Sequence, residues 1–284
     1  MLKEIWRDFL SFIKVGQENS VDIKLHYEDH GKGKPVVLIH GWPLNGGSWE
    51  KQEAVLLDVG YRVVTYDRRG FGESSKPSTG YDYDTFTSDL DRVIQTLELD
   101  DVTLVGFSMG TGEVTRYLKK YGSERIEKAA LLASIPPYLL NTPDNPEGID
   151  KNVFDGFIND INSDRLAFLT QFFQNFYNMD VLGGKLISDE VMRYSWNVGS
   201  RASPIATVKC VDAWLTDFRE DLKSIDVPVM VVHGDADRIL PIDVTARRLN
   251  KIIKPEKYVE VKDAPHGLIW THAKEINHAL MDFL

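Results

Sequence analysis

The residues Gly106-Phe107-Ser108-Met109-Gly110 form a Gly-x-Ser-x-Gly pattern between an expected strand and an expected helix. The apolar run 102–105 precedes the pattern and predicts a buried strand, and residues 113–121 predict a helix after it. A sharp turn here strains the serine backbone and leaves no room for side chains at the glycine positions. The pattern is typical of a nucleophile elbow, with the serine hydroxyl at a strand end. An ordinary glycine-rich turn is the alternative, and the rest of the chain decides between the two.

Strands and helices alternate on both sides of this turn. We expect further strands at 12–15, 23–27, 36–39, 62–66, 126–133, 227–232 and 258–261, and further helices at 48–57, 83–97, 243–252 and 273–283. With 102–105 included, the expected strands number eight. Alternation of this kind predicts an α/β fold, with a mostly parallel sheet covered by helices on both faces.

The stretch 135–222 interrupts the alternation. Pro136-Pro137 opens it, no strand pattern follows up to Leu222, and residues 166–176 have the apolar spacing of a helix. We therefore expect a helical cap insertion at 135–222 that lies over the sheet. The α/β core then consists of residues 12–134 and 223–284.

Residues 1–11 form an extension before this core. Leu2, Ile5, Trp6 and Phe9 have the spacing of an amphipathic helix. We interpret the extension as a helix that docks on the protein itself or on another subunit, as an appended tag, or as a leader. A membrane-surface anchor is disfavoured because the polar face carries charges of both signs.

The composition of the 284-residue chain excludes several classes of function. The formal net charge is −10, from 33 basic and 43 acidic residues, which argues against binding of nucleic acid. No apolar run approaches the ~18 residues of a membrane-spanning helix. Cys210 is the single cysteine, so no internal disulfide can form. We expect a reducing, cytoplasmic location and a buried, unreactive thiol.

Two later loops offer the partners that a serine nucleophile needs. A serine hydroxyl requires a base within hydrogen-bond reach and an acid that orients the base. The strand at 227–232 runs into His233-Gly234-Asp235-Ala236-Asp237, and the strand at 258–261 runs into a loop that contains His266. The carboxyl ends of parallel strands meet along one edge of a sheet. The order serine, acid, histidine is also the order that follows a nucleophile elbow. This joint occurrence favours the elbow over a chance match.

We assign Ser108 as the nucleophile, His266 as the base and Asp237 as the acid. Asp235 is the alternative acid, but we expect it to accept backbone N–H groups within its own turn. His272 is the alternative base, but it falls at the start of the last expected helix. The remaining histidines, at positions 26, 30, 233 and 278, are interpreted as surface or structural residues.

A tetrahedral intermediate needs hydrogen-bond donors for its oxyanion. We expect one donor to be the backbone N–H of Met109, near the start of a helix whose dipole favours negative charge. The second donor is the backbone N–H of Trp42, in the loop after the strand at 36–39, because Pro43 has no N–H. His40, in the same loop, is interpreted as a structural residue.

Five motifs resemble those of the cofactor-free haloperoxidase, perhydrolase and arylesterase group of α/β-hydrolases. They are His40-Gly41-Trp42-Pro43-Leu44, Tyr66-Asp67-Arg68-Arg69-Gly70-Phe71-Gly72, the stretch from Gly106 to Glu113, the stretch from His233 to Arg238, and Ala264-Pro265-His266-Gly267. The resemblance extends from about Phe12 to the C-terminus. It implies an α/β-hydrolase fold and a serine enzyme that works without a metal or another cofactor.

The resemblance also implies a reaction. Ser108 would be acylated by a small ester or a carboxylic acid, and water would then release the acid. Hydrogen peroxide would release a peracid instead, and the peracid would oxidise halide in solution. In this group a proline after the oxyanion-loop residue is associated with perhydrolysis, and Pro43 occupies that place, where it would aim the Trp42 carbonyl at peroxide. The resemblance further implies a homo-oligomer.

Other readings differ in their chemistry. A plain carboxylesterase, arylesterase or lactonase would use the same residues without significant perhydrolysis. A non-catalytic protein of this fold that binds a small ligand can also keep the triad. Haloalkane dehalogenases and most epoxide hydrolases share the fold but need a carboxylate nucleophile, so Ser108 argues against both. The aromatic side chains of the cap predict a small apolar acyl pocket.

Overall fold

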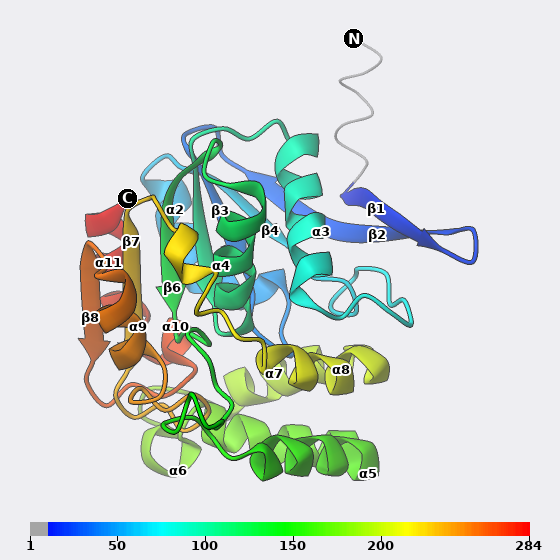
Figure 1. The fold of residues 1–284 in the computed structure, drawn as a ribbon, viewed down its shortest axis with the longest axis vertical. Helices are drawn as coiled ribbons and strands as arrows, with labels where there is room; N and C mark the ends of the chain where they lie inside the picture. Colours follow the sequence, from blue (N-terminus) through cyan, green and yellow to red (C-terminus); the bar gives the residue numbers. More distant parts are fainter. Residues whose placement is uncertain (1–10) are drawn as a thin grey trace.

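The computed structural model describes residues 11–284 and has an eight-stranded sheet at its centre, in the order β1-β2-β4-β3-β5-β6-β7-β8 (Figure 1). The strands are β1 (Phe12–Glu18), β2 (Val21–His30), β3 (Pro35–Ile39), β4 (Arg62–Tyr66), β5 (Val102–Phe107), β6 (Ile126–Leu132), β7 (Val229–Gly234) and β8 (Lys257–Val261). β2 pairs antiparallel with β1 and with β4, whereas β4, β3, β5, β6, β7 and β8 run parallel. The expected mostly parallel sheet is confirmed. The interpretation of the first ten residues lies outside the described residues.

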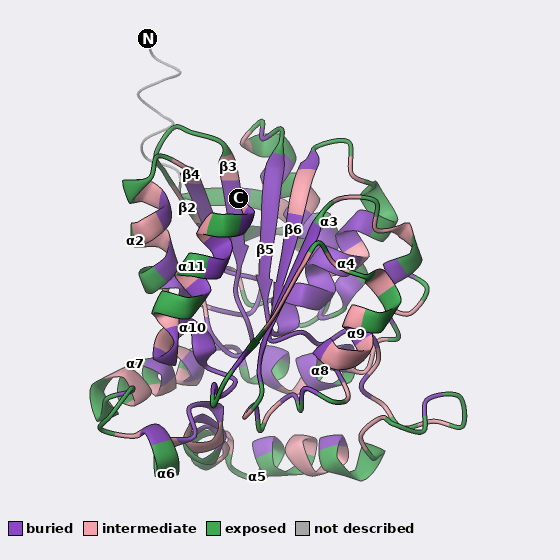
Figure 2. Cartoon of the chain, turned by 90° about the vertical axis from the view of Figure 1, so that its left-hand side faces the viewer, coloured by how far each residue is buried: buried purple, intermediate pink, exposed green. Residues whose placement is uncertain are grey.

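Helices cover both faces of the sheet (Figure 2). They are α2 (Glu50–Asp58), α3 (Tyr83–Thr96), α4 (Met109–Tyr121), α9 (Ala246–Ile253), α10 (Leu268–Thr271) and α11 (Ala273–Phe283), with the short 3-10 helices η1 (Gly46–Trp49) and η2 (Leu222–Ser224). Figure 2 shows α2, α10 and α11 on one face, and α3, α4 and α9 on the other. From residue 11 onward, no helix combines the length and the apolar character needed to cross a membrane.

The central strands are apolar throughout because both of their faces are buried. Successive side chains of a strand point to opposite faces, and β3 follows this rule. Val36 and Leu38 belong to one core cluster, which also contains apolar residues of α2 and α11. Val37 and Ile39 belong to the other, which contains apolar residues of α3, α4 and α9. The apolar run at 36–39 therefore supplies two cores at once.

Four helices lie between β6 and β7 in the chain and beyond the carboxyl ends of the parallel strands (Figure 1). They are α5 (Lys151–Phe176), α6 (Met179–Leu182), α7 (Asp189–Ser200) and α8 (Pro204–Trp214). α5 is interrupted at Asp164, whose φ and ψ are −153° and 89°. The Asp164 carboxylate accepts the N–H groups of Leu166 and Ala167 and so caps the second half of α5. Residues 135–222, all described, hold no strand of the sheet. The division of the chain at 135 and 222 stays a prediction.

Several boundaries differ from those expected. β1 and β2 are longer than 12–15 and 23–27 and meet at Asn19-Ser20, where both residues have positive φ. β5 continues through Phe107, and α4 begins at Met109 rather than at 113. Gly110 and Gly112 have low helix propensity, so the sequence pattern predicts a helix only from residue 113. Tertiary packing overrides this preference, and the helix includes both glycines. β7 begins two residues later than expected and α9 three residues later.

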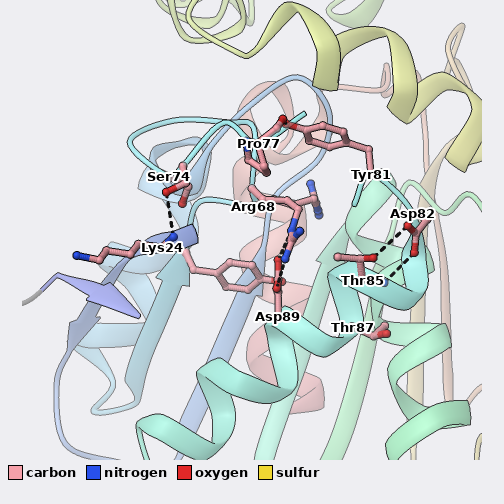
Figure 3. A network of polar contacts seen from close by, with 12 residues as sticks. Lys24, Arg68, Ser74, Pro77, Tyr81, Asp82, Thr85, Thr87 and Asp89 are labelled. Atoms are coloured by element: carbon pink, nitrogen blue, oxygen red, sulfur yellow. Dashed lines mark hydrogen bonds and ion pairs between the residues drawn. The ribbon is translucent and has the colours of Figure 1, made fainter. Parts of the chain in front are cut away.

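Polar contacts tie the loop after β4 to α3. At the start of α3, the Asp82 carboxylate accepts the backbone N–H of Thr85 at 2.8 Å and its hydroxyl at 3.0 Å (Figure 3). Further along the helix, the buried Asp89 accepts two hydrogen bonds from Arg69, each of 2.7 Å. A bidentate arginine–carboxylate pair sets both position and orientation. The loop that contains Arg69 is therefore held against α3.

A second buried network connects β4, α4 and the loop after β3. Arg68 donates from Nε to Glu113 at 2.8 Å, and Tyr66 also bonds to Glu113. Arg68 further donates from Nη2 to the His40 carbonyl and from its backbone N–H to His40 Nε2, both at 2.9 Å. Since Nε2 accepts, Nδ1 of His40 carries the proton and donates to the Gly41 carbonyl at 2.8 Å. Burial, followed by the nearby Arg68 charge, lowers the pKa of His40 to about 3.

The low pKa of His40 predicts that the protein loses stability in mild acid. The unfolded chain protonates this histidine near pH 6.5, whereas the folded chain does so only at about pH 3. Between pH 6.5 and about pH 3 the unfolded state therefore binds more protons than the folded state. The free energy of unfolding decreases as the pH is lowered through this window, by up to about 1.4 kcal/mol per pH unit from this group. Urea unfolding at several pH values between 5 and 7 measures this dependence. His40→Gln should show a shallower slope, and equal slopes in the two proteins would contradict the assignment.

Candidate active site

Ser108 lies at the sharp turn between β5 and α4. Its φ and ψ are 53° and −118°, a conformation that residues with a side chain rarely adopt. A Cβ at Gly106 would lie 2.6 Å from the Gly110 carbonyl oxygen, and a Cβ at Gly110 would lie 2.4 Å from the Ile39 carbonyl oxygen. Both glycines are thus required by close backbone approach. The turn has the geometry that the Gly-x-Ser-x-Gly pattern predicts.

The structure brings Ser108, His266 and Asp237 together from the ends of β5, β8 and β7. His266 Nε2 lies 2.9 Å from Ser108 Oγ, and His266 Nδ1 lies 2.7 Å from Asp237 Oδ2. A carboxylate accepts hydrogen bonds, so Nδ1 carries the proton and Nε2 is free to accept from the serine hydroxyl. All three side chains are buried. The arrangement allows the serine proton to move to His266 while Asp237 orients the ring.

The Asp237 carboxylate is held by four donors. Oδ1 accepts the backbone N–H groups of Ile239 and Leu240, each at 2.8 Å. Oδ2 accepts from His266 and also lies 3.2 Å from Nε2 of His233. Burial acts to raise the pKa of Asp237, but the interactions with His266 and His233 outweigh it, and the pKa lies well below its usual range. Asp237 therefore stays ionised near neutral pH.

The alternative acid and base lie elsewhere. Asp235 Oδ1 accepts the backbone N–H of Asp263 at 2.6 Å, so this aspartate joins the loops after β7 and β8. The expectation that Asp235 accepts within its own turn is wrong in this detail, because β8 is adjacent to β7 and brings its loop within reach. His272 Nδ1 bonds to the Thr271 hydroxyl at 2.9 Å and precedes α11. Neither residue contacts Ser108 by a hydrogen bond within residues 11–284.

The loop after β3 passes directly beside the serine. A Cβ at Gly41 would lie 2.9 Å from Ser108 Cβ, so the backbone of this loop contacts the elbow. Among the described residues, neither the Trp42 nor the Met109 backbone N–H donates to a protein acceptor. Met109 follows Ser108 in the chain and Trp42 follows Gly41, so both amides belong to the two segments that meet at the elbow, and free amides of this kind are what an oxyanion requires. The Trp42–Pro43 peptide bond is cis.

A cavity of about 420 Å³ lies between α5 and the segment that follows Asp237, and none of its lining residues belongs to the triad. Aromatic side chains of α5 form one wall, including Phe168 and Phe172, and both rings also contact the Trp42 indole, at 6.2 Å and 4.9 Å between centroids. Arg238 and Ile239 form part of the other wall. The cavity has the size of a small-molecule site, and its lining combines aromatic rings with polar side chains such as Gln171 and Asn175.

Sequence reasoning assigned no role in the site to three buried polar side chains, namely Arg68, Glu113 and His233, of which His233 contacts Asp237. Glu113 occupies the buried face of α4, where a carboxylate needs a partner. A glutamate at a buried helix position could therefore have indicated a buried ion pair. Arg68 follows a strand directly, at the edge where the other site residues lie. His233 ends an otherwise apolar strand, and its contact with Asp237 depends on the path of the loop between them.

Two further groups bear on chemistry. Cys210 is buried on α8, and burial raises the pKa of its thiol to about 12, as expected for an unreactive residue. Within the described part of the chain, Glu28, His30 and Glu53 form a group whose ligand atoms lie within 4.8 Å of one another. These three residues come from β2 and α2 and could hold a metal ion. They are separate from the triad loops.

Comparison with known proteins agrees with this geometry. The profile of the alpha/beta hydrolase fold family matches residues 34–273. A protein of Synechocystis sp. that carries the provisional name of a non-heme chloroperoxidase is 58% identical over 275 residues, which is 97% of this chain and 100% of that protein. A bifunctional esterase/perhydrolase of Acinetobacter calcoaceticus is 34% identical over 278 residues, which is 95% of this chain and 98% of that protein.

A solved structure is similarly close. The crystal structure of a bromoperoxidase from Bacillus anthracis superimposes with a TM-score of 0.91 and 47% sequence identity, covering 96% of this chain and 98% of that one. The family match spans most of the chain, and the relatives are named as enzymes. The chain belongs to the α/β-hydrolase family and is an enzyme of the group that includes the non-heme haloperoxidases and esterase/perhydrolases.

Proposed function

We propose that this enzyme is a serine hydrolase that forms an acyl-enzyme on Ser108 from small esters or carboxylic acids, and that it also acts as a perhydrolase. The observation that carries the proposal is the hydrogen-bonded chain from Ser108 through His266 to Asp237, beside two unsatisfied backbone N–H groups. The names of the relatives, which include chloroperoxidases and a bifunctional esterase/perhydrolase, support it.

Acylation follows from this geometry. Ser108 Oγ attacks the substrate carbonyl carbon while His266 Nε2 takes the serine proton. The carbonyl oxygen becomes an oxyanion and accepts hydrogen bonds from the N–H groups of Trp42 and Met109. Collapse of the intermediate breaks the bond to the leaving group, which receives the proton from His266. Because serine, imidazole and amides supply nucleophile, base and charge stabilisation, the scheme needs no metal or other cofactor.

Deacylation decides between the two activities. Water, deprotonated by His266, attacks the acyl-enzyme and releases a carboxylic acid. Hydrogen peroxide attacks in the same way and releases a peracid, which then oxidises halide away from the enzyme. Peroxide has a second hydroxyl group that water lacks, and this group can donate a hydrogen bond to the Trp42 carbonyl. We propose that Pro43 sets the direction of that carbonyl.

The cavity supports small and largely apolar acyl or aryl groups as substrates. Its volume of about 420 Å³ and the aromatic wall of α5 suit a short alkyl or a single-ring ester. A plain esterase or lactonase would use the same cavity and differ only in its response to peroxide. We further infer that copies of the chain associate and that the enzyme works in the cytoplasm. These inferences rest on the resemblance and on the single cysteine.

Replacing the nucleophile tests the hydrolase proposal. Ser108→Ala should lower the kcat/KM for p-nitrophenyl acetate at least about a thousandfold, because the acyl-enzyme can no longer form. Asp237→Asn should lose a similar factor through the wrong imidazole tautomer. Asp235→Asn is the matched control in the same loop and should stay within a few-fold of the wild type. Substantial turnover by Ser108→Ala would refute Ser108 as the nucleophile, whereas absence of turnover in the wild type would favour a binding function.

The role of Pro43 is tested separately. Pro43→Leu should lower the rate of acetate perhydrolysis about tenfold relative to the rate of p-nitrophenyl acetate hydrolysis, since one hydrogen bond to peroxide in the transition state is lost. Peracid is measured by its oxidation of bromide, with and without added peroxide. If both rates change by the same factor, the proline does not select between peroxide and water.

A further inference from the structure

His233 contacts the candidate catalytic acid at the same carboxylate oxygen as His266. The residue lies near the end of β7 and its side chain is fully buried. Its Nε2 atom lies 3.2 Å from Asp237 Oδ2 and 2.8 Å from the Leu240 carbonyl oxygen. Its Nδ1 atom lies 3.1 Å from the backbone nitrogen of Ser134, which follows β6. The ring therefore connects the ends of two neighbouring strands.

These contacts determine the tautomer of His233. A backbone N–H can only donate, so Nδ1 must accept from Ser134 and carries no proton. The single ring proton is then on Nε2, where it is shared between the Leu240 carbonyl and Asp237 Oδ2. An added proton on Nδ1 would face the Ser134 N–H and break this contact. His233 therefore donates from Nε2, and both of its ring nitrogens are engaged outside the Ser108–His266 pair.

We propose that His233 is a positioning residue of the triad, one that shares the Asp237 carboxylate with His266 and limits how strongly the carboxylate holds the protonated base. This inference rests on the proposed hydrolase function. Oδ2 receives both imidazoles, while the two backbone amides fix Oδ1, so the carboxylate cannot rotate away from His266. A donor that stabilises the carboxylate weakens its pull on the imidazolium of His266.

This sharing matters because His266 must both take and return a proton. An imidazolium held too strongly by Asp237 is a poor general acid toward the leaving group, and it also removes the neutral base at mildly acidic pH. His233, as the second donor to Oδ2, weakens the hold of Asp237 on the His266 imidazolium and so counteracts both effects. His233 thus acts on the reaction only through Asp237 and touches neither the serine nor the substrate.

Other charged groups near His233 belong to the adjacent strand and helix. Glu260 of β8 is the register partner of His233, and it is bound by Arg247 of α9 at 2.6 Å and by Tyr258. Glu260 and Arg247 are partly exposed, so added salt screens their effect, whereas the buried contact with Asp237 is screened much less. Ionic strength therefore separates the two influences.

Two variants separate a positioning role from simple packing. His233→Met removes the donor, and His233→Gln keeps an N–H at a similar distance along the side chain. We expect the acid limb of the kcat/KM profile to move up by about 0.5–1 pH unit in His233→Met, at both low and high salt, and to stay near the wild-type position in His233→Gln. A merely structural role would lower stability in both variants and leave the limb unmoved, which would overturn the proposal.

A second measurement needs neither variant nor turnover. In wild-type protein labelled with ¹⁵N-histidine, the proposal predicts that His233 shows an unprotonated Nδ1 and a protonated Nε2 at pH 7. The reverse tautomer would overturn it.

A third measurement uses the two variants but not their activity. The NMR titration of His266 in His233→Met and His233→Gln tests the same shift as the kinetic profile. A failure of ester turnover in the wild type would therefore refute the hydrolase function while the positioning contact is still judged from the spectra.

Discussion

The site depends on a backbone turn that is unfavourable by itself. Ser108 adopts φ = 53°, and a strained residue of this kind costs on the order of 1–3 kcal/mol, which the surroundings must offset. The Ser108 N–H donates to Leu132 of β6 at 2.9 Å, and its carbonyl accepts from the backbone and the hydroxyl of Thr111. Two glycines allow β3 and α4 to approach the turn closely. The strained turn is thus held by contacts with the central strands of the sheet.

The same central position explains why the remaining site residues converge. β5, which Ser108 follows, lies between β3 and β6, and the loop with Trp42 follows β3. The loops after β7 and β8 supply Asp237 and His266. Ser134, which follows β6, bonds to His233, and His233 in turn contacts Asp237. A parallel sheet presents all these carboxyl ends along one edge. Geometry that spans 158 residues of sequence, from Ser108 to His266, therefore depends on strand order alone.

Sequence patterns predicted the parts of the structure that have a local signature. The strand at 62–66 and the helix at 273–283 agree with β4 and α11 to the residue, because apolar spacing is clear and turn residues flank both. The hydrogen-bonded grouping of Ser108, Asp237 and His266 could be expected because each follows a strand within a recognisable motif. The residue pattern placed the start of α4 at 113 because two glycines precede that position, although the elbow motif by itself put Met109 near the start of the helix. Arg68 and Glu113 were missed because their contact joins positions 45 residues apart, and nothing local marks it.

The buried polar contacts around the triad serve position more than stability. Removing Arg68 and Glu113 from water is costly, and a buried ion pair often does no better than well-packed apolar side chains. What this pair provides is direction, since Arg68 also holds His40, and His40 holds the carbonyl of Gly41 beside Ser108.

Water and peroxide meet the same serine, base and amides, so those groups cannot discriminate between them. Discrimination requires a group that contacts the second oxygen of peroxide, and such a group must be fixed in direction. The loop from Gly41 to Pro43 is held from one side by this network, and the Trp42 indole packs against Phe172 and Trp214 on the other. We therefore propose that selection of the attacking molecule depends on how rigidly that loop is anchored, and the anchor extends through Arg68 to Glu113 of α4.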